Sequence, residues 1–342
     1  MGNKIFQKIH AAKWIGAEQL RKVLASVVNI TGGVLGLVYV GTAAGAPAAS
    51  SNSGKFAIFT GTGWLMRSNG TIWDRVGGGP VVIDSWANLQ AYVSASYAGC
   101  KFRCNDVGIN GSDWRVNDAG TSLVIDSPIT LYREEYTRAR APSGTIGTGA
   151  SGNITFGTAA PRAYTEGLYV YLPSIATTPA ITAGWYWCVM STTTLGTLYA
   201  SKGGAAINFS AGASYTGVTT QLNQPGITVK GGLLSTNRQI NVNGIVTATA
   251  NANTKTTFLN FGGSNAAVNS LTVAYTPYNT SISNKGVTNA QVVTSGLFSA
   301  GTTPTYLAID TTADFAVNLY LTNGTTATDW WCVENCRIVL KP

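Results

Sequence analysis

Ionisable side chains are scarce in this sequence, and their scarcity excludes most kinds of catalysis. Only 11% of its 342 residues are charged, against about a quarter in ordinary globular proteins. No Asp or Glu occurs between Glu166 and Asp310, so the middle of the chain lacks the carboxylate pair that glycosidic cleavage usually requires. The only histidine is His10, which removes Ser-His-Asp, Cys-His and histidine–metal sites from the rest of the chain. We therefore expect no catalytic residue, no cofactor and no metal site.

The acids near the C-terminus keep one enzymatic alternative open. A polysaccharide depolymerase could combine acids across a subunit boundary, or it could use four acids of this region: Asp310, Asp314, Asp329 and Glu334. Their spacing is instead typical of turns and strand edges, which favours a structural role. Turn chemistry explains the acids nearer the N-terminus without calcium: Asp106, Asp113, Asp118 and Asp126.

The basic excess gives no sign of a nucleic-acid partner. The chain has 22 Lys and Arg against 14 Asp and Glu, a net charge of +8. Residues 1–22 hold half of that excess, and the other basic residues are scattered singly, so no stripe follows a phosphate backbone. The Gly-rich turns fit no phosphate-binding motif. A surface so poor in charge is common in all-β proteins that work outside cells and in subunits that bury surface in an oligomer; composition does not separate the two.

The five cysteines do not form a disulfide framework in this interpretation. They are Cys100, Cys104, Cys188, Cys332 and Cys336, an odd number. On a strand, each Cys-x3-Cys pair places its sulfurs on one face but more than about 10 Å apart, too far for a bridge. We expect buried thiols in a protein folded in a reducing cytoplasm, with a cross-pairing between the two pairs as the alternative.

The N-terminal region predicts a docking segment instead of a membrane anchor. Residues 1–30 have an imperfect helical period, and residues 23–53 carry no charge. The basic region before the uncharged run is too long for a secretory signal. Asn, Thr and Gly interrupt the uncharged run itself, so we expect no stable membrane insertion. We assign residues 1–54 to a helical docking segment that ends in a linker of small residues, Ala43–Ser53.

Residues 55–142 contain an internal repeat. The motifs Gly61–Thr71 and Gly111–Thr121 share Gly, Trp, Gly and Thr at the same offsets. Each predicts a β-hairpin with its turn at Asn or Asp and Gly, and the Trp residues are expected in the core. Between the motifs, a short helix over Asp84–Val93 would be capped by Asp84 or Ser85.

Residues 143–225 predict a middle β domain with one strand unusually rich in aromatics. In Gly184–Met190, Trp185 and Trp187 share one face of the strand. Such a strand could stack against a sugar, but burial between sheets or subunits is the favoured reading.

The last segment, residues 226–342, predicts a β-sandwich. In Phe315–Leu321, apolar and other side chains alternate, the pattern of a half-buried strand. Similar short strands recur between clusters of Gly, Asn, Ser and Thr, with no helical period among them. The expected fold class is therefore mostly β: an N-terminal helix, a hairpin-repeat domain, a middle β domain and a C-terminal sandwich.

Three motifs in that segment support a family resemblance. Gly231–Ile240, Ala252–Thr257 and Phe261–Gly263 resemble the C-terminal jelly-roll module of tail-fibre and receptor-binding proteins of tailed bacteriophages. The later run Thr288–Val292 fits the same pattern. The resemblance implies a jelly roll, a homotrimer, and a place on the outside of a virion assembled in the host cytoplasm.

Host attachment is the function that this resemblance implies. Recognition of a bacterial surface glycan would use exposed aromatics and amides in loops of the C-terminal domain: Tyr275, Tyr278, Asn279, Trp330 and Trp331. Because Trp330 and Trp331 are adjacent, a strand would turn one of them away from the core. A structural subunit that binds no cell, such as a head fibre, decoration or collar protein, is the alternative, and a depolymerase is the third.

Overall fold

The described residues fold mostly into β-strands, as the sequence predicts. The computed structural model describes residues 37–59, 64–77, 81–83, 85–149, 151–217, 222–272, 274–295, 304–323 and 328–342. It divides into two compact units, Met1–Asp126 and Ser127–Pro342. The sequence placed a boundary at residue 142, sixteen residues further along. The helix expected over residues 1–30 lies outside the described residues.

The first unit begins with a four-stranded sheet. Its strands lie in the order β1-β2-β3-β4, with β1 and β2 parallel and the other pairs antiparallel. Their bounds are Leu37–Gly41, Phe56–Phe59, Trp64–Ser68 and Trp73–Gly77. Because parallel strands cannot be joined by a tight hairpin, a crossover must connect β1 to β2.

That crossover occupies the segment that the sequence predicted to be a linker. It forms two short 3-10 turns, Ala43–Gly45 and Ala49–Asn52. Ala49 is buried and its carbonyl accepts a hydrogen bond from Ser68 Oγ at 2.6 Å. Trp73 Nε1 donates to the carbonyl of Pro47 at 2.9 Å. Residues 37–54 therefore belong to the fold of this sheet and do not act as a spacer.

A second four-stranded sheet repeats the same plan. Its order is β5-β6-β7-β8, again with a parallel first pair; the strands are Val81–Ile83, Lys101–Cys104, Ser112–Val116 and Leu123–Val124. The crossover contains helix α3, Trp86–Gln90, whose N-cap Ser85 accepts a hydrogen bond from Asn88 N–H. This confirms the predicted helix and its cap. The repeat is thus a complete four-stranded unit, larger than the hairpin seen in the sequence.

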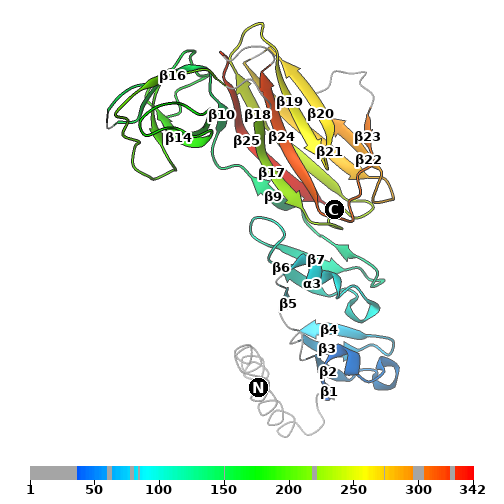
Figure 1. Cartoon of the computed structure of the whole chain (residues 1–342). Coiled ribbons are helices and arrows are strands. Elements are labelled where there is room, and N and C mark those ends of the chain that lie inside the picture. The colour runs from blue at the N-terminus through cyan, green and yellow to red at the C-terminus, as the bar shows by residue number, and fades with distance from the viewer. Residues whose placement is uncertain are drawn as a thin grey trace. The chain divides into compact units, whose positions relative to one another are not determined.

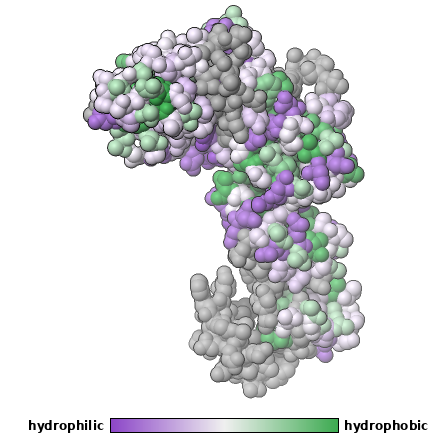
Figure 2. All heavy atoms as spheres, viewed as in Figure 1, coloured by the Kyte–Doolittle hydropathy of each residue, from purple (hydrophilic) through white to green (hydrophobic). Residues whose placement is uncertain are grey.

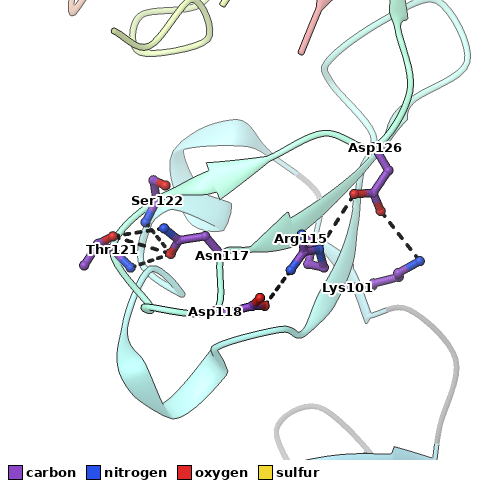
Figure 3. Close-up of polar contacts among 7 residues, drawn as sticks. All are labelled: Lys101, Arg115, Asn117, Asp118, Thr121, Ser122 and Asp126. Carbon is purple, nitrogen blue, oxygen red and sulfur yellow. Dashed lines mark hydrogen bonds and ion pairs between the residues drawn. The ribbon is translucent and has the colours of Figure 1, made fainter. Parts of the chain in front are cut away.

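Both hairpin turns are held by an asparagine side chain. Asn69 Oδ1 accepts from the N–H groups of residues 71 and 72 at 2.8 and 2.9 Å. Asn117 Oδ1 accepts from Thr121 and Ser122 N–H at 2.7 and 3.1 Å (Figure 3). Gly70 and Gly120 have φ of 93° and 72°, a conformation that glycine adopts without steric cost. The predicted hairpins and their turn positions are confirmed, and Trp114 is buried as expected.

The acids of the second sheet form surface ion pairs and local hydrogen bonds. Arg115 pairs with Asp118 at 2.7 Å and with Asp126 at 3.7 Å, and Lys101 also lies 3.7 Å from Asp126 (Figure 3). Pairs this exposed each contribute about 0–1 kcal/mol. Among the described residues, no group of three or more His, Cys, Asp or Glu could hold a metal ion.

The second unit contains a β-sandwich built from two antiparallel sheets (Figure 1). The first sheet runs β9-β25-β18-β21-β22-β23, with bounds Ile129–Arg133, Trp331–Lys341, Gln239–Ala248, Tyr275–Asn284, Gln291–Ser295 and Thr305–Leu307. The other runs β17-β24-β19-β20, with bounds Leu222–Val229, Phe315–Asn323, Lys255–Phe261 and Ser264–Leu271. Alternate apolar side chains of both sheets are buried, among them Val246, Ile338, Phe261 and Val317. This is the period-2 pattern that the sequence predicted.

Seven further strands lie between β9 and β17 in the chain, and we call residues 134–217 the insert. Its strands run β16-β11-β12-β15-β14-β13-β10; in chain order they are Arg138–Arg140, Gly144–Ile146, Asn153–Phe156, Leu168–Leu172, Gly184–Met190, Leu195–Tyr199 and Ala213–Tyr215. Strand β10 pairs with the start of β25. The predicted middle domain and C-terminal domain therefore share one continuous sheet.

The sheet changes its buried side where β10 meets β25. In register, Arg138 lies opposite Val333, which lies opposite Val246 of β18 inside the sandwich. Ala139 and Cys332 point to the other side and belong to the insert's own core. In the sandwich, the second sheet covers one side of the large sheet. In the insert, that same side faces away from the insert core, and the opposite side is buried.

A β-bulge in β25 separates two of the cysteines. Ile245 pairs with Asn335 and Val246 with Val333, so Glu334 is the extra residue. Because of this bulge, Cys332 and Cys336 lie on opposite sides of the sheet. The prediction that they share one face was wrong. All five cysteines are buried and none forms a disulfide, as expected.

Candidate functional site

Only part of the predicted binding set is exposed. Tyr275 is 63% exposed and Asn279 is also exposed. Tyr278 is buried, and its hydroxyl donates to the carbonyl of Asn335 at 3.2 Å. The ring fits because Gly244 lies opposite it in β18 and a Cβ at Gly244 would overlap the Tyr278 ring. Tyr278 is a packing residue, so its assignment as a ligand contact was wrong.

Trp330 and Trp331 are both fully buried. Trp330 lies in the insert core, where its ring is 4.6 Å from that of Phe156 and its Nε1 donates to the carbonyl of Thr158 at 2.8 Å. Trp331 lies opposite Ala248 on the sandwich side. The two side chains do lie on opposite sides of the sheet, but the sheet has a core on each side at this point, so their assignment as ligand contacts was wrong.

The structure instead gathers aromatic side chains on the coreless side of the insert. Strand β13 alternates: Leu168, Val170 and Leu172 are buried in the core, while Tyr169 and Tyr171 lie on the other side and are half-buried. Their register partners on β14 are Trp187 and Trp185. We call this surface the aromatic face; it consists of Tyr136, Tyr169, Tyr171, Trp185 and Trp187.

The rings of the aromatic face pack edge to face. Centroids are 5.1 Å apart for Tyr169 and Trp187, 5.1 Å for Tyr136 and Trp187, and 5.3 Å for Tyr171 and Trp185, the geometry that aromatic pairs prefer. Trp187 is buried beneath the others. Its ring lies against Gly167, where φ is 89° and a Cβ would overlap the indole. A glycine is therefore required at that position.

Two cations lie over these rings. The Arg138 guanidinium is 5.0 Å from the Tyr169 ring and 5.3 Å from Trp185, and its Nε donates to Glu134 at 2.9 Å. Lys202 Nζ lies 3.9 Å from the Tyr136 ring centroid and bonds the Tyr136 hydroxyl. Cation–π contacts of this kind stabilise the arrangement. They also place N–H donors beside half-exposed apolar rings.

This combination suits carbohydrate chemistry. A sugar offers flat patches of C–H groups that pack on aromatic rings, and hydroxyls that accept hydrogen bonds from cationic donors. Figure 2 shows the surface over the insert mostly in pale colours, of intermediate hydropathy. The sequence left two alternatives for Trp185 and Trp187, a sugar-binding platform or burial. In the structure Trp187 is buried and Trp185 is half-buried. The alternation of Tyr169 and Tyr171 with buried residues was the signal that could have located the rest.

The four acids of the depolymerase alternative are occupied by structural contacts. Glu334 accepts hydrogen bonds from Tyr164 and Thr247 at 2.6 Å and from Thr137 at 2.9 Å, which ties the insert to the sandwich. Burial and nearby Cys332 and Glu334 raise the pKa of Tyr164, so its hydroxyl stays a donor.

The other three acids support turns and loops. Asp329 is buried beside Lys255, 3.4 Å away, and accepts from the side-chain amides of Asn251 and Asn253. Burial acts to raise its pKa, but these amides and the Lys255 charge outweigh it, and the pKa is lowered. Asp310 accepts from Thr312 N–H and Oγ1, and Asp314 accepts from the N–H of residue 231 at 2.8 Å.

Comparison with known proteins adds no relative. The chain matches no protein-family model and no curated protein sequence. Within the described residues, no helix is long and apolar enough to cross a membrane. The function must therefore be argued from the site.

Proposed function

We propose that this chain is a host-attachment subunit of a tailed-bacteriophage virion, a fibre protein that assembles as a homotrimer and binds a bacterial surface glycan through the aromatic face. The observation that carries the proposal is that face itself: half-buried tyrosines and a tryptophan, flanked by Arg138 and Lys202, on the side of the insert's strands that points away from the insert core. The binding surface moves from the predicted C-terminal loops to the insert.

The strand order of the sandwich supports a jelly roll, and with it the family resemblance. Eight of its strands form the sheets β9-β25-β18-β21 and β17-β24-β19-β20. The chain passes from one sheet to the other at each step except β19 to β20, the connectivity of two Greek keys. The insert lies between the first and second of these strands, and β22 and β23 widen one sheet.

The contacts of the acids support binding without cleavage. Glu334 and Asp329 each accept several hydrogen bonds from neutral donors, and Asp310 and Asp314 cap turns. Hydrolysis of a glycoside needs one protonated and one ionised carboxyl group on either side of the bond. Acids already committed to structural partners are poorly placed for that work.

Cell binding tests the proposal. Fluorescently labelled full-length chain would be titrated onto candidate host cells and onto strains that lack the surface glycan, with its oligomeric mass measured alongside. Saturable binding by a trimer, lost on the glycan-deficient strains, is the expected result. A well-folded oligomer that binds no cell would contradict it and favour a structural or decorating subunit.

Docking to the particle is tested by a shorter deletion than the sequence suggested. Strand β1 begins at Leu37, so removal of residues 1–54 would damage the first sheet. Removal of residues 1–36 leaves every described strand intact and should abolish incorporation into particles while cell binding persists. Normal incorporation of that truncation would contradict a docking role.

A further inference from the structure

Arg140 is a fully buried cation whose guanidinium has no partner among the residues that the structure describes. It lies on β10 with none of its surface exposed. Among the described residues, Nε, Nη1 and Nη2 have no hydrogen-bond acceptor and no carboxylate lies within ion-pair distance. Burial lowers its pKa only to about 10, so the guanidinium remains charged at neutral pH. Because an uncompensated buried charge costs several kcal/mol, something must neutralise it.

Trp331 presents a second unsatisfied donor beside it. Its Nε1 is buried and has no acceptor among the described residues. Arg140 and Trp331 are directly opposite in the antiparallel pair of β10 and β25. Side chains at opposite positions leave the sheet on the same face with their Cβ atoms about 4.5–5.5 Å apart. The two side chains therefore start from neighbouring Cβ atoms on the same side of the sheet.

Both members of this pair can donate hydrogen bonds but cannot accept them. A guanidinium has five N–H donors in a planar fork and an indole has one, and neither has an acceptor. Neither side chain can satisfy the other, and a neutral water molecule offers too few lone pairs and no charge. An oxyanion offers several lone pairs and a negative charge, and arginine binds such groups bidentately.

We propose that Arg140 and Trp331 form a buried binding site for one small oxyanion, of the phosphate or carboxylate type. It lies where the sandwich interior passes into the aromatic face, between Tyr171 on β13 and Ala248 on β18. The anion completes the core at the junction of insert and sandwich. Its role is separate from glycan binding and does not depend on it.

Equilibrium dialysis of full-length protein against radiolabelled inorganic phosphate tests the site. We expect retention of one phosphate per chain by the wild type, and a midpoint of thermal unfolding that rises with phosphate at constant ionic strength set by chloride. Arg140→Met should lose both effects. Arg133→Met, which removes an exposed guanidinium, should keep both.

Two results would overturn the proposal. The first is wild-type protein that retains no phosphate and, once denatured after exhaustive dialysis, releases no other anion to ion chromatography; this holds even if Arg140→Met does not fold. The second is a wild-type unfolding midpoint that does not change with phosphate at constant ionic strength, together with phosphate retention in Arg140→Met equal to that of the wild type.

Discussion

The two sides of the large sheet carry different chemistry. On the insert, the aromatic face presents half-buried rings with cations over them. On the opposite side, over the sandwich, β18 and β21 present what we call the amide face: Asn241, Asn243, Asn279 and Ser281, with Tyr275 at one end. A sheet can thus be a stacking surface in one region and a polar surface in another.

Part of the amide face and a neighbouring strand are already hydrogen-bonded. Ser281 Oγ donates to Asn241 Oδ1 at 3.0 Å, and Arg337 on the neighbouring strand donates to Thr130 Oγ1 at 2.8 Å. A ligand there would have to replace existing hydrogen bonds or their hydration, with little net gain. Burial of ring surface is favourable at about 25 cal/mol per Å². Tyr275 and Asn279 were chosen as binding residues because they were expected to be exposed. Exposed ring area beside hydrogen-bond donors is therefore a better indicator of a glycan site than exposure alone.

The largest expected effect is on stability, and it tests whether an acid of the sandwich stabilises the fold. Asp329→Asn leaves the buried Lys255 uncompensated and should lower the free energy of unfolding at pH 7 by about 3–5 kcal/mol. Since the native pKa of Asp329 is lowered, its contribution is present above its unfolded-state pKa of about 3.9 and lost as pH falls through the native value. Denaturant titrations at pH 7 and in acid should show the difference between wild type and variant shrink in acid.

Glycan binding should survive the Asp329→Asn substitution wherever the protein remains folded. Asp310→Asn, at an exposed turn, is the matched control and should leave the unfolding midpoint unchanged. If Asp329→Asn instead abolished host binding in a folded protein, the assignment of chemistry to the insert would be wrong.

A substitution under the aromatic face comes next. Gly167→Ala should cost about 2–3 kcal/mol of stability and weaken glycan binding more than about tenfold, because the new Cβ displaces Trp187 in addition to straining the backbone. Gly203→Ala is the control: φ there is 76° but nothing lies within 4 Å of the Cβ. Equal losses in the two variants, measured by thermal unfolding and cell binding, would show that Trp187 packing does not matter.

The cations of the aromatic face should have a smaller effect. Lys202→Met keeps the aliphatic stem but removes the charge over Tyr136, and should weaken glycan binding about threefold to fivefold, as expected for a cation–π contact of roughly 0.5–1 kcal/mol. Lys341→Met, at the end of β25, is the matched control and should leave the binding isotherm unchanged. A larger loss from the control would move the site onto the sandwich.

The smallest effect is expected on the amide face. Asn279→Ala removes an exposed amide and should change glycan affinity by less than about twofold, since surface substitutions away from a site are nearly neutral. Surface plasmon resonance on immobilised host glycan would measure it. A loss of tenfold or more would restore the binding role that the sequence suggested for this residue.

Local signals in the sequence predicted local structure well. The Asn and Gly of the two hairpin turns and the cap at Ser85 act within a few residues, so the sequence alone locates them. Strands β1 and β5 were missed because they are short and pair in parallel across a crossover, which leaves no hairpin signal. The four-stranded repeat was therefore recognised only by its last two strands.

Long-range pairing decided the rest. Trp330 and Trp331 are both buried because β10, nearly 200 residues earlier in the chain, pairs with β25 and brings the insert's core over one side. The bulge at Glu334, which separates Cys332 from Cys336, depends on the register with β18. The aromatic face depends on which side of a shared sheet stays uncovered, and periodicity within one strand cannot show that.

The most direct test of the account is calorimetric titration of an oligosaccharide from the host surface into two full-length variants, Trp185→Ala and Tyr275→Ala. Both remove one aromatic ring that is at least partly exposed, one from each side of the sheet. We predict an affinity at least about tenfold weaker for Trp185→Ala and unchanged for Tyr275→Ala. Loss of binding in Tyr275→Ala with full affinity in Trp185→Ala would contradict the aromatic face as the glycan site.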